Sequence, residues 1–191
     1  MSFFGVVFVI GYLFYFIPKE NTENNSTLLT ASVGSLYEPK KENIPLLENL
    51  KIPIIGVDAT VESVGLTSAG AVDVPKGPSD AAWFDLGPRP GEIGSAVFVG
   101  HSGWKNGIPA VFDNLYKLNK GDKLYIESDK GVSTEFVVRE IRTYGENDDA
   151  SSVFISNDNK AHLNLITCEG IWNKAKKSYS NRLVVFADIK Q

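Results

Sequence analysis

From residue 51 onward, the chain consists of short runs of branched and aromatic residues broken by Gly, Pro, Asn and Asp. Runs of this length and composition predict β-strands joined by tight turns. About eight strands with few helices favour an all-β fold, and specifically a closed barrel, because closure leaves no unpaired strand edge. The predicted strands cover residues 51–57, 61–67, 71–74, 95–101, 123–128, 134–144, 162–168 and 182–189. One or two helical turns are expected at 111–118 and 151–155.

The first residues differ from the rest of the chain. Residues 2–17 carry no charge and are almost wholly apolar, and Pro18-Lys19-Glu20 ends the run. The run is slightly shorter than the roughly 20 residues of a membrane-spanning helix. We expect a membrane anchor over 1–18, a polar spacer over 19–50 and a folded domain over 51–191. A buried core helix and a cleaved signal peptide are the alternatives, but no small-residue cleavage site follows closely.

Composition limits the partners of the folded domain. The chain is 43% hydrophobic and carries a formal net charge of −4. This composition is ordinary for a globular protein. A nucleic-acid-binding protein usually has a basic stripe, so we expect no nucleic-acid partner.

Three reactive groups lie at the ends of different predicted strands. Cys168, the single cysteine, closes 162–168; His101, one of two histidines, closes 95–101; Arg182 opens 182–189. A thiol, an imidazole and a guanidinium are the groups needed for acyl transfer through a thioester. Strand alternation gives each of them apolar neighbours on its own strand face, namely Val99, Ile166 and Val184 in turn.

Other residues compete for these roles. A lone cysteine at a strand end is commonly a small buried hydrophobe. His162 is six residues from Cys168, about 20 Å along an extended strand, so we expect it to be a surface residue that does not pair with the thiol. Arg139 and Arg142 resemble solvated cross-strand partners, and Arg89 lies between prolines in a loop.

The motifs around these residues resemble those of the sortases, the membrane-anchored cysteine transpeptidases of bacterial cell surfaces. Asn164-Leu165-Ile166-Thr167-Cys168 is similar to their Thr-Leu-x-Thr-Cys signature, and an arginine opens the next strand as in the family. The histidine segment 97–102 and the aspartate segment 112–115 also look like those of sortases. The resemblance covers roughly residues 54–189.

The resemblance implies an eight-stranded barrel that cleaves a Leu-Pro-x-Thr-Gly-like sorting signal between Thr and Gly. It implies Cys168 as nucleophile, His101 as general acid and Arg182 as oxyanion stabiliser. The acyl group of a surface protein would pass to an amine of the cell envelope. The domain would lie on the extracellular face of a bacterial membrane, held by a single-pass anchor. The alternatives are a cysteine endopeptidase that hydrolyses the same signal and a non-catalytic surface β-barrel that binds a ligand.

Two departures from the family pattern concern the motif and the loop after it. Asn164 stands where the motif usually has threonine; it is the outermost motif position, and we expect it to have no effect on the chemistry. The lysine-rich loop 169–181 follows the cysteine, so the subclass is left open. We expect no extra domain, and in this respect the chain is similar to the compact, monofunctional sortases, including class F-like ones.

We expect no cofactor. Glu146, Asp148, Asp149 and Asp158 offer oxygen ligands for calcium, but their spacing is irregular and an acidic surface loop is the commoner explanation. One cysteine and two separated histidines provide no zinc site.

Overall fold

The computed structural model describes residues 47–175 and 178–190. The predicted anchor at 1–18 and almost all of the predicted spacer lie outside these residues. Within the part described, no helix is long and apolar enough to cross a membrane. The first strand begins at Leu47, four residues before the predicted start of the domain.

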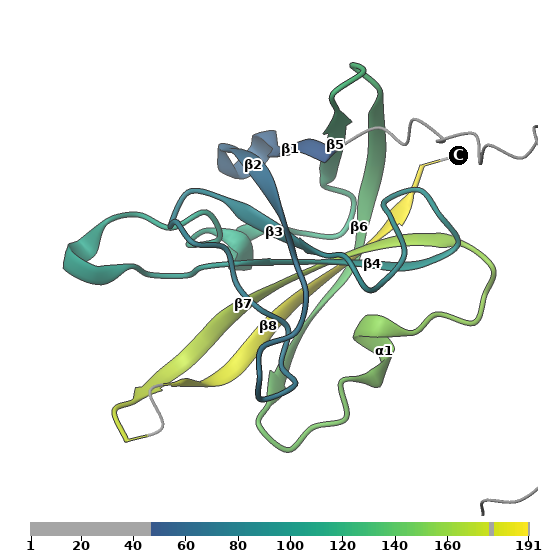
Figure 1. Cartoon of the computed structure of the whole chain (residues 1–191). Coiled ribbons are helices and arrows are strands. Elements are labelled where there is room, and N and C mark those ends of the chain that lie inside the picture. Colours follow the sequence, from purple (N-terminus) through teal and green to yellow (C-terminus); the bar gives the residue numbers. More distant parts are fainter. Residues whose placement is uncertain (1–46, 176–177, 191) are drawn as a thin grey trace, which may run out of the picture. The chain divides into compact units, whose positions relative to one another are not determined.

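Eight strands close into a barrel, which confirms the predicted all-β fold (Figure 1). Around the barrel the order is β1-β2-β3-β4-β7-β8-β6-β5. Most connections are antiparallel, whereas β3 pairs parallel with β2, and β7 pairs parallel with β4. The strands are β1 (Leu47–Ile52), β2 (Val57–Val64), β3 (Ala81–Phe84), β4 (Gly94–Gly100), β5 (Lys123–Ser128), β6 (Ser133–Gly145), β7 (Ala161–Asn173) and β8 (Ser178–Ile189).

Helical segments are short. α1 (Ser151–Phe154) is a single turn between β6 and β7, as predicted for 151–155. Three 3₁₀ turns lie at Pro53–Ile55, Lys105–Gly107 and Leu115–Lys117, and the last falls within the helical turns predicted for 111–118.

The barrel interior is filled by side chains from every strand. Leu50, Phe98, Phe136, Leu165 and Val185 are completely buried in one continuous cluster. Burial of a side chain of this size typically contributes about 1.5–3 kcal/mol relative to leaving it exposed. Outside the barrel, α1 covers a second, smaller cluster formed by Val153, Val184 and Phe186. β8 is therefore packed on both faces.

The predicted strands 51–57 and 71–74 are not formed as expected, and β2 covers Val57–Val64 instead of 61–67. β7 runs past Cys168 to Asn173 and β8 begins at Ser178, so most of the predicted loop 169–181 is strand. The predicted strand 51–57 is broken, because Pro53 begins a 3₁₀ turn that ends at Gly56, whose φ of 70° suits glycine. The predicted strand 71–74 is a loop in which Val72 makes one isolated bridge to Leu66. The four-residue β3 was not predicted, and it is stabilised by pairing with β2 and β4 rather than by any local pattern.

His162 is buried, so its predicted surface position is wrong. Its side chain is 4% exposed and lies between two carboxylates. His162 Nδ1 is 2.8 Å from Asp188 Oδ1, and Nε2 is 2.9 Å from Asp158 Oδ1. Arg139 Nη1 approaches the same Asp188 oxygen at 2.6 Å, which confirms Arg139 as a cross-strand partner. An imidazole is tolerated in this position because both ring nitrogens have partners.

The cluster predicts a particular acid response. Hydrogen bonds from His162 and then Ser156 hold the pKa of Asp158 well below its ordinary value of 3.8. The ionised carboxylate therefore contributes stability above its unfolded-state pKa, and this contribution is lost as the pH falls through the lower folded-state pKa. We expect Asp158→Asn to lower the free energy of unfolding at neutral pH.

Between about pH 5 and about pH 2, the free energy of unfolding of Asp158→Asn should fall less than that of the wild type. Urea denaturation at a series of pH values measures both quantities. Equal slopes against pH in the two proteins would contradict the linkage.

Candidate active site

Three adjacent strands, β4, β7 and β8, bring the predicted functional residues to one level of the barrel. Cys168 on β7 is the direct register partner of Arg182 on β8. Opposite residues of an antiparallel pair have Cα atoms about 4.5–5.5 Å apart and side chains on the same face. Cys168 and Arg182 are therefore neighbours, although 13 residues separate them along the chain.

His101 follows β4, on the other side of β7. The parallel register pairs Val99 with Ile166, and continuing it by two residues sets His101 beside Cys168. Thr167 Oγ1 donates a hydrogen bond of 2.8 Å to the carbonyl oxygen of Gly100, which ties the two strand ends together. The three predicted residues thus lie on neighbouring strands in the order His101, Cys168, Arg182.

Close packing requires a glycine immediately before the histidine. A Cβ atom at Gly100 would overlap the ring of Phe112 and the side chain of Val111. The backbone N–H of Phe112 donates to the carbonyl oxygen of His101 at 2.9 Å. The backbone at His101, immediately after β4, is therefore held close against the barrel.

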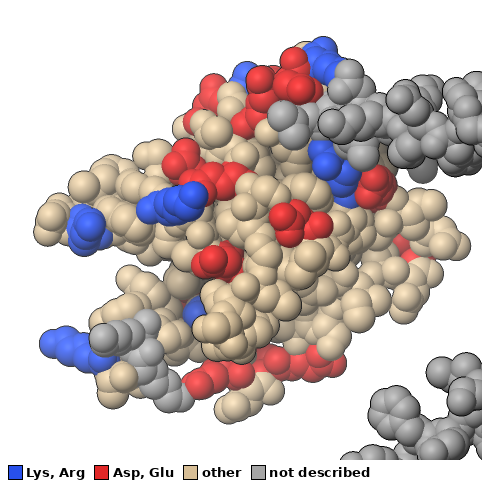
Figure 2. Space-filling model, in the orientation of Figure 1, with Lys and Arg blue, Asp and Glu red and all other residues tan. Residues whose placement is uncertain are grey.

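The loop that follows His101 is organised by one carboxylate. Asp113 Oδ1 accepts a hydrogen bond of 2.6 Å from the backbone N–H of Gly103, and Oδ2 accepts one of 2.9 Å from Ala110. Both ends of the loop are thereby held to a single side chain. In Figure 1 this loop and the β7–β8 hairpin project on the same side of the barrel, and Figure 2 shows the surface hollowed between them.

The imidazole of His101 is half-buried and has two fixed contacts. Nε2 lies 2.8 Å from the carbonyl oxygen of Pro75, in the loop between β2 and β3. The indole ring of Trp104 packs edge to face against the imidazole, with ring centroids 4.6 Å apart. Since a carbonyl only accepts hydrogen bonds, Nε2 carries the proton and the other ring nitrogen, Nδ1, remains available.

A cavity of about 1050 Å³ opens beside Cys168 and Arg182. Val99, Ile166 and Val184 form part of its lining, which agrees with the strand faces expected from sequence. Its walls come from three connections: the loop before β3, the β6–β7 segment that includes α1, and the β7–β8 hairpin. The cavity is largely apolar, and polar groups gather near the cysteine, as in many ligand-binding pockets.

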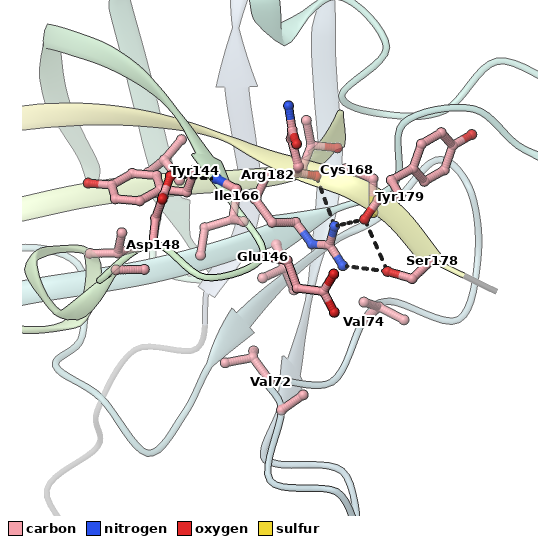
Figure 3. A pocket seen from close by; sticks show the side chains of 18 of the residues that line it. Val72, Val74, Tyr144, Glu146, Asp148, Ile166, Cys168, Ser178, Tyr179 and Arg182 are labelled. Carbon is pink, nitrogen blue, oxygen red and sulfur yellow. Dashed lines mark hydrogen bonds between the residues drawn. The ribbon is translucent and has the colours of Figure 1, made fainter. Parts of the chain in front are cut away.

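Arg182 directs its guanidinium into this cavity (Figure 3). Nη1 donates to the carbonyl oxygens of Tyr179 at 3.0 Å and Asn181 at 2.9 Å, and Nη2 lies 3.4 Å from Ser178 Oγ. Arginine has five N–H donors, so Nε and one N–H of Nη2 have no partner among the residues described. These contacts fix the plane of the guanidinium and leave donors for a ligand.

The three predicted residues come from neighbouring strands but are not hydrogen-bonded to one another. Cys168 and Arg182 both line the cavity, whereas His101 is turned toward Pro75. Across the described part of the chain, no side-chain hydrogen bond links the three residues. The sequence did not predict the contact of His101 with Pro75, because every residue has a backbone carbonyl and the residue type does not show which one will accept a hydrogen bond. The hydrogen bond from Thr167, a residue of the Asn164–Cys168 motif, to Gly100 was not predicted either.

No metal cluster is found within residues 47–175 and 178–190, since no three His, Cys, Asp or Glu side chains are grouped to hold an ion. Two of the acidic residues considered for calcium have other partners: Asp148 accepts from the N–H of Gly145 at 2.7 Å, and Asp158 pairs with His162. Calcium binding stays an untested alternative.

Solved structures with similar folds are sortases. Sortase C-1 from Actinomyces oris is 23% identical, with a TM-score of 0.59 over 75% of this chain and 73% of that one. A Clostridium perfringens sortase D5 transpeptidase is 22% identical, with a TM-score of 0.56 over 77% and 79% of the two chains. Sortase A from Corynebacterium diphtheriae is 25% identical, with a TM-score of 0.57 over 77% and 61%.

No curated protein sequence matches the chain. In contrast, the family model for the sortase domain matches residues 50–190, which includes all three predicted functional residues and seven of the eight strands in full. The family model therefore matches well over half of the sequence. The chain belongs to the sortase family of cysteine transpeptidases.

Proposed function

We propose that this sortase cleaves a Leu-Pro-x-Thr-Gly-like sorting signal between Thr and Gly and transfers the upstream protein to a cell-envelope amine. The observation that carries the proposal is the register of β4, β7 and β8 at the mouth of an apolar cavity. The register sets Arg182 of β8 opposite the thiol of Cys168, and His101 follows β4 on the other side of β7.

Cys168 is the nucleophile in this proposal. Its thiolate attacks the threonine carbonyl carbon, and the C–N bond to glycine then breaks to leave a thioester. A free cysteine is mostly protonated at neutral pH, and nearby positive charge increases the thiolate fraction. The half-buried position of Cys168 in the lining of the cavity, opposite Arg182 in the strand register, supports this role.

His101 supplies the proton for the leaving amine. His101 acts in its doubly protonated form: the Nε2 proton is engaged by the Pro75 carbonyl, so the proton on Nδ1 passes to the glycine nitrogen as the C–N bond breaks. An incoming acceptor amine then attacks the thioester and loses a proton to Nδ1, while Cys168 leaves as thiolate. The enzyme ends in its starting protonation state, with one amide broken and one formed.

Arg182 stabilises the negative oxygen of both tetrahedral intermediates. Its backbone contacts to Tyr179 and Asn181 hold the guanidinium before substrate arrives. A preorganised donor of this kind costs no reorganisation during the reaction, and removal of one typically raises the barrier by about 3 kcal/mol.

Location and partners follow from the proposed reaction. A sorting enzyme of this kind acts on surface proteins that carry the signal, and we propose that the domain faces the cell exterior, anchored through the apolar residues 1–18. On the face shown in Figure 2, Lys and Arg are interspersed with acidic residues and do not gather into one basic patch. This distribution favours a peptide substrate over nucleic acid.

Mass spectrometry of the domain mixed with a Leu-Pro-x-Thr-Gly peptide tests the first half-reaction. We expect the mass of the upstream acyl group to be added at Cys168, and Cys168→Ala to form no adduct while it remains folded. Added triglycine should convert the adduct to a ligated peptide. Hydrolysis alone would favour the endopeptidase alternative, and peptide binding with no adduct would favour the non-catalytic barrel.

Arg182→Lys tests the guanidinium while the positive charge is kept. Lysine lacks the planar fork of donors, so kcat should fall by about 10²- to 10³-fold. KM should change much less, because the donor acts on charge that develops in the transition state. Steady-state kinetics with the same peptide measure both, and a kcat near that of the wild type would show that charge alone suffices.

Thr167→Val tests the link between the strand ends that carry His101 and Cys168. Valine keeps the shape but removes the hydrogen bond to Gly100, which should lower the free energy of unfolding by about 1 kcal/mol. We also expect a lower kcat, because the two strand ends are no longer fixed together. Thermal unfolding and kinetics are measured on one preparation; an unaltered kcat in the less stable variant would argue against this alignment.

A further inference from the structure

Asn164, the motif residue farthest along the chain from Cys168, is a deeply buried amide beside the cavity. Only 1% of the surface of Asn164 is exposed. Nδ2 donates a hydrogen bond of 2.7 Å to the carbonyl oxygen of Val153, within α1. Asn164 Oδ1 is buried and has no hydrogen-bond partner among the described residues. A buried acceptor without a partner is costly, so the interaction that this side chain contributes is the bond from Nδ2 to Val153.

The partner of Asn164 forms a wall of the catalytic cavity. Val153 and Phe154 of α1 both line the cavity that contains Cys168. α1 is only four residues long, and its N-cap residue, Ala150, makes no capping hydrogen bond. A helix this short has no stability of its own, so its position depends on contacts with the barrel.

Apart from the packing of Val153 on Val184 and Phe186, few contacts hold α1 in place. Ser152 Oγ lies 3.2 Å from the hydroxyl of Tyr144, in an exposed position. The ring of Phe154 meets that of Phe84 edge to face, with centroids 6.2 Å apart. The Asn164 bond is buried and short, so it is stronger and more directional than these two. It fixes a main-chain atom of α1, whereas the other two hold side chains.

Asn164 also has a defined place relative to the nucleophile. It shares a strand face with Ile166 and Cys168, at a distance of four residues or about 13 Å along β7. An extended peptide with its scissile carbonyl at Cys168 covers that distance in about four residues. The Leu-Pro-x-Thr part of the proposed signal is four residues long, so a signal that runs from Cys168 toward Asn164 brings its first residue to the end of the cavity that α1 walls.

We propose that Asn164 is a positioning residue that acts through α1 to shape the part of the cavity that selects the upstream end of the substrate. The proposal rests on the proposed function for its kinetic consequence. Asn164 does not touch the reacting atoms, so its loss should weaken binding and selectivity and leave the chemical step intact.

The test compares wild type with Asn164→Leu, which keeps the volume of the side chain and removes the donor to Val153. We expect KM for the Leu-Pro-x-Thr-Gly peptide to rise about fivefold to tenfold, the size of one lost hydrogen bond. We expect kcat to stay within about twofold. The preference for Leu over Ala at the first position of the signal should fall by a similar factor, which general destabilisation would not cause.

Two further variants complete the set. Phe84→Leu removes the ring contact to Phe154 and should shift KM and selectivity in the same direction, so the proposal stays testable if Asn164→Leu does not fold. Ser156→Ala is the matched control: it removes the 2.8 Å bond to Asp158 in the same connection without touching α1. Its kinetics should equal those of the wild type.

Two measurements separate this proposal from the proposed function. Alkylation of Cys168 by iodoacetamide should proceed at the wild-type rate in Asn164→Leu, whereas hydrogen exchange of the α1 amides should be faster. If the wild type forms no acyl adduct, the proposed function is wrong, and exchange still decides whether Asn164 holds α1. Unchanged exchange, unchanged KM and selectivity, or a lower kcat at constant KM would each overturn the positioning role.

Discussion

The register of β7 is the constraint on which the rest of this structure depends. β7 pairs parallel with β4 and antiparallel with β8, and the second pairing sets Cys168 opposite Arg182. A shift of one residue would turn every side chain of β7 to the other face of the sheet. The thiol would then face the barrel interior, where Leu163 and Leu165 are buried, and the cavity would lose its sulfur atom.

Several contacts outside the ladder reinforce this register. Thr167 bonds to the carbonyl of Gly100 near the cysteine end of the strand, and His162 pairs with Asp188 of β8 near the other. Asn164 lies between them and reaches α1. Polar side chains thus occur at intervals along an otherwise apolar strand. Each of them bonds β7 to a different neighbour. The position of β7 therefore fixes both the segment that carries Cys168 and the wall of the cavity that α1 forms.

The Pro75 carbonyl and the Trp104 ring give His101 a defined orientation without joining it to Cys168. In this arrangement the imidazole and the thiol are neighbours across a strand pair rather than hydrogen-bonded partners. A substrate carbonyl and a leaving amine have to lie between the two groups. A gap between the proposed acid and the proposed nucleophile is therefore compatible with the proposed reaction, since catalytic hydrogen bonds often tighten only when substrate is bound.

Sequence reasoning was most successful where the pattern was long. β5 was predicted at its observed bounds, and β4 and β7 were found because their apolar runs are continuous. The end of β7 was misplaced at Cys168, since the five residues up to Asn173 are polar or exposed and are held in the strand by pairing with β8. β3 was missed since four residues carry too little pattern, and pairing on both sides compensates for that. His162 was misjudged because the carboxylates that make its burial tolerable come from a loop and from β8, 4 and 26 residues away.

The sequence by itself determined the fold class, the family and the identity of the three reactive side chains, because strand periodicity and local motifs are written in consecutive residues. Only the tertiary structure decided which groups meet. The Cys168–Arg182 pairing, the Pro75 contact to His101 and the Asn164 bond to α1 join residues from separate segments. Such contacts depend on strand register and barrel closure, which are properties of the whole chain and not of any short stretch of it.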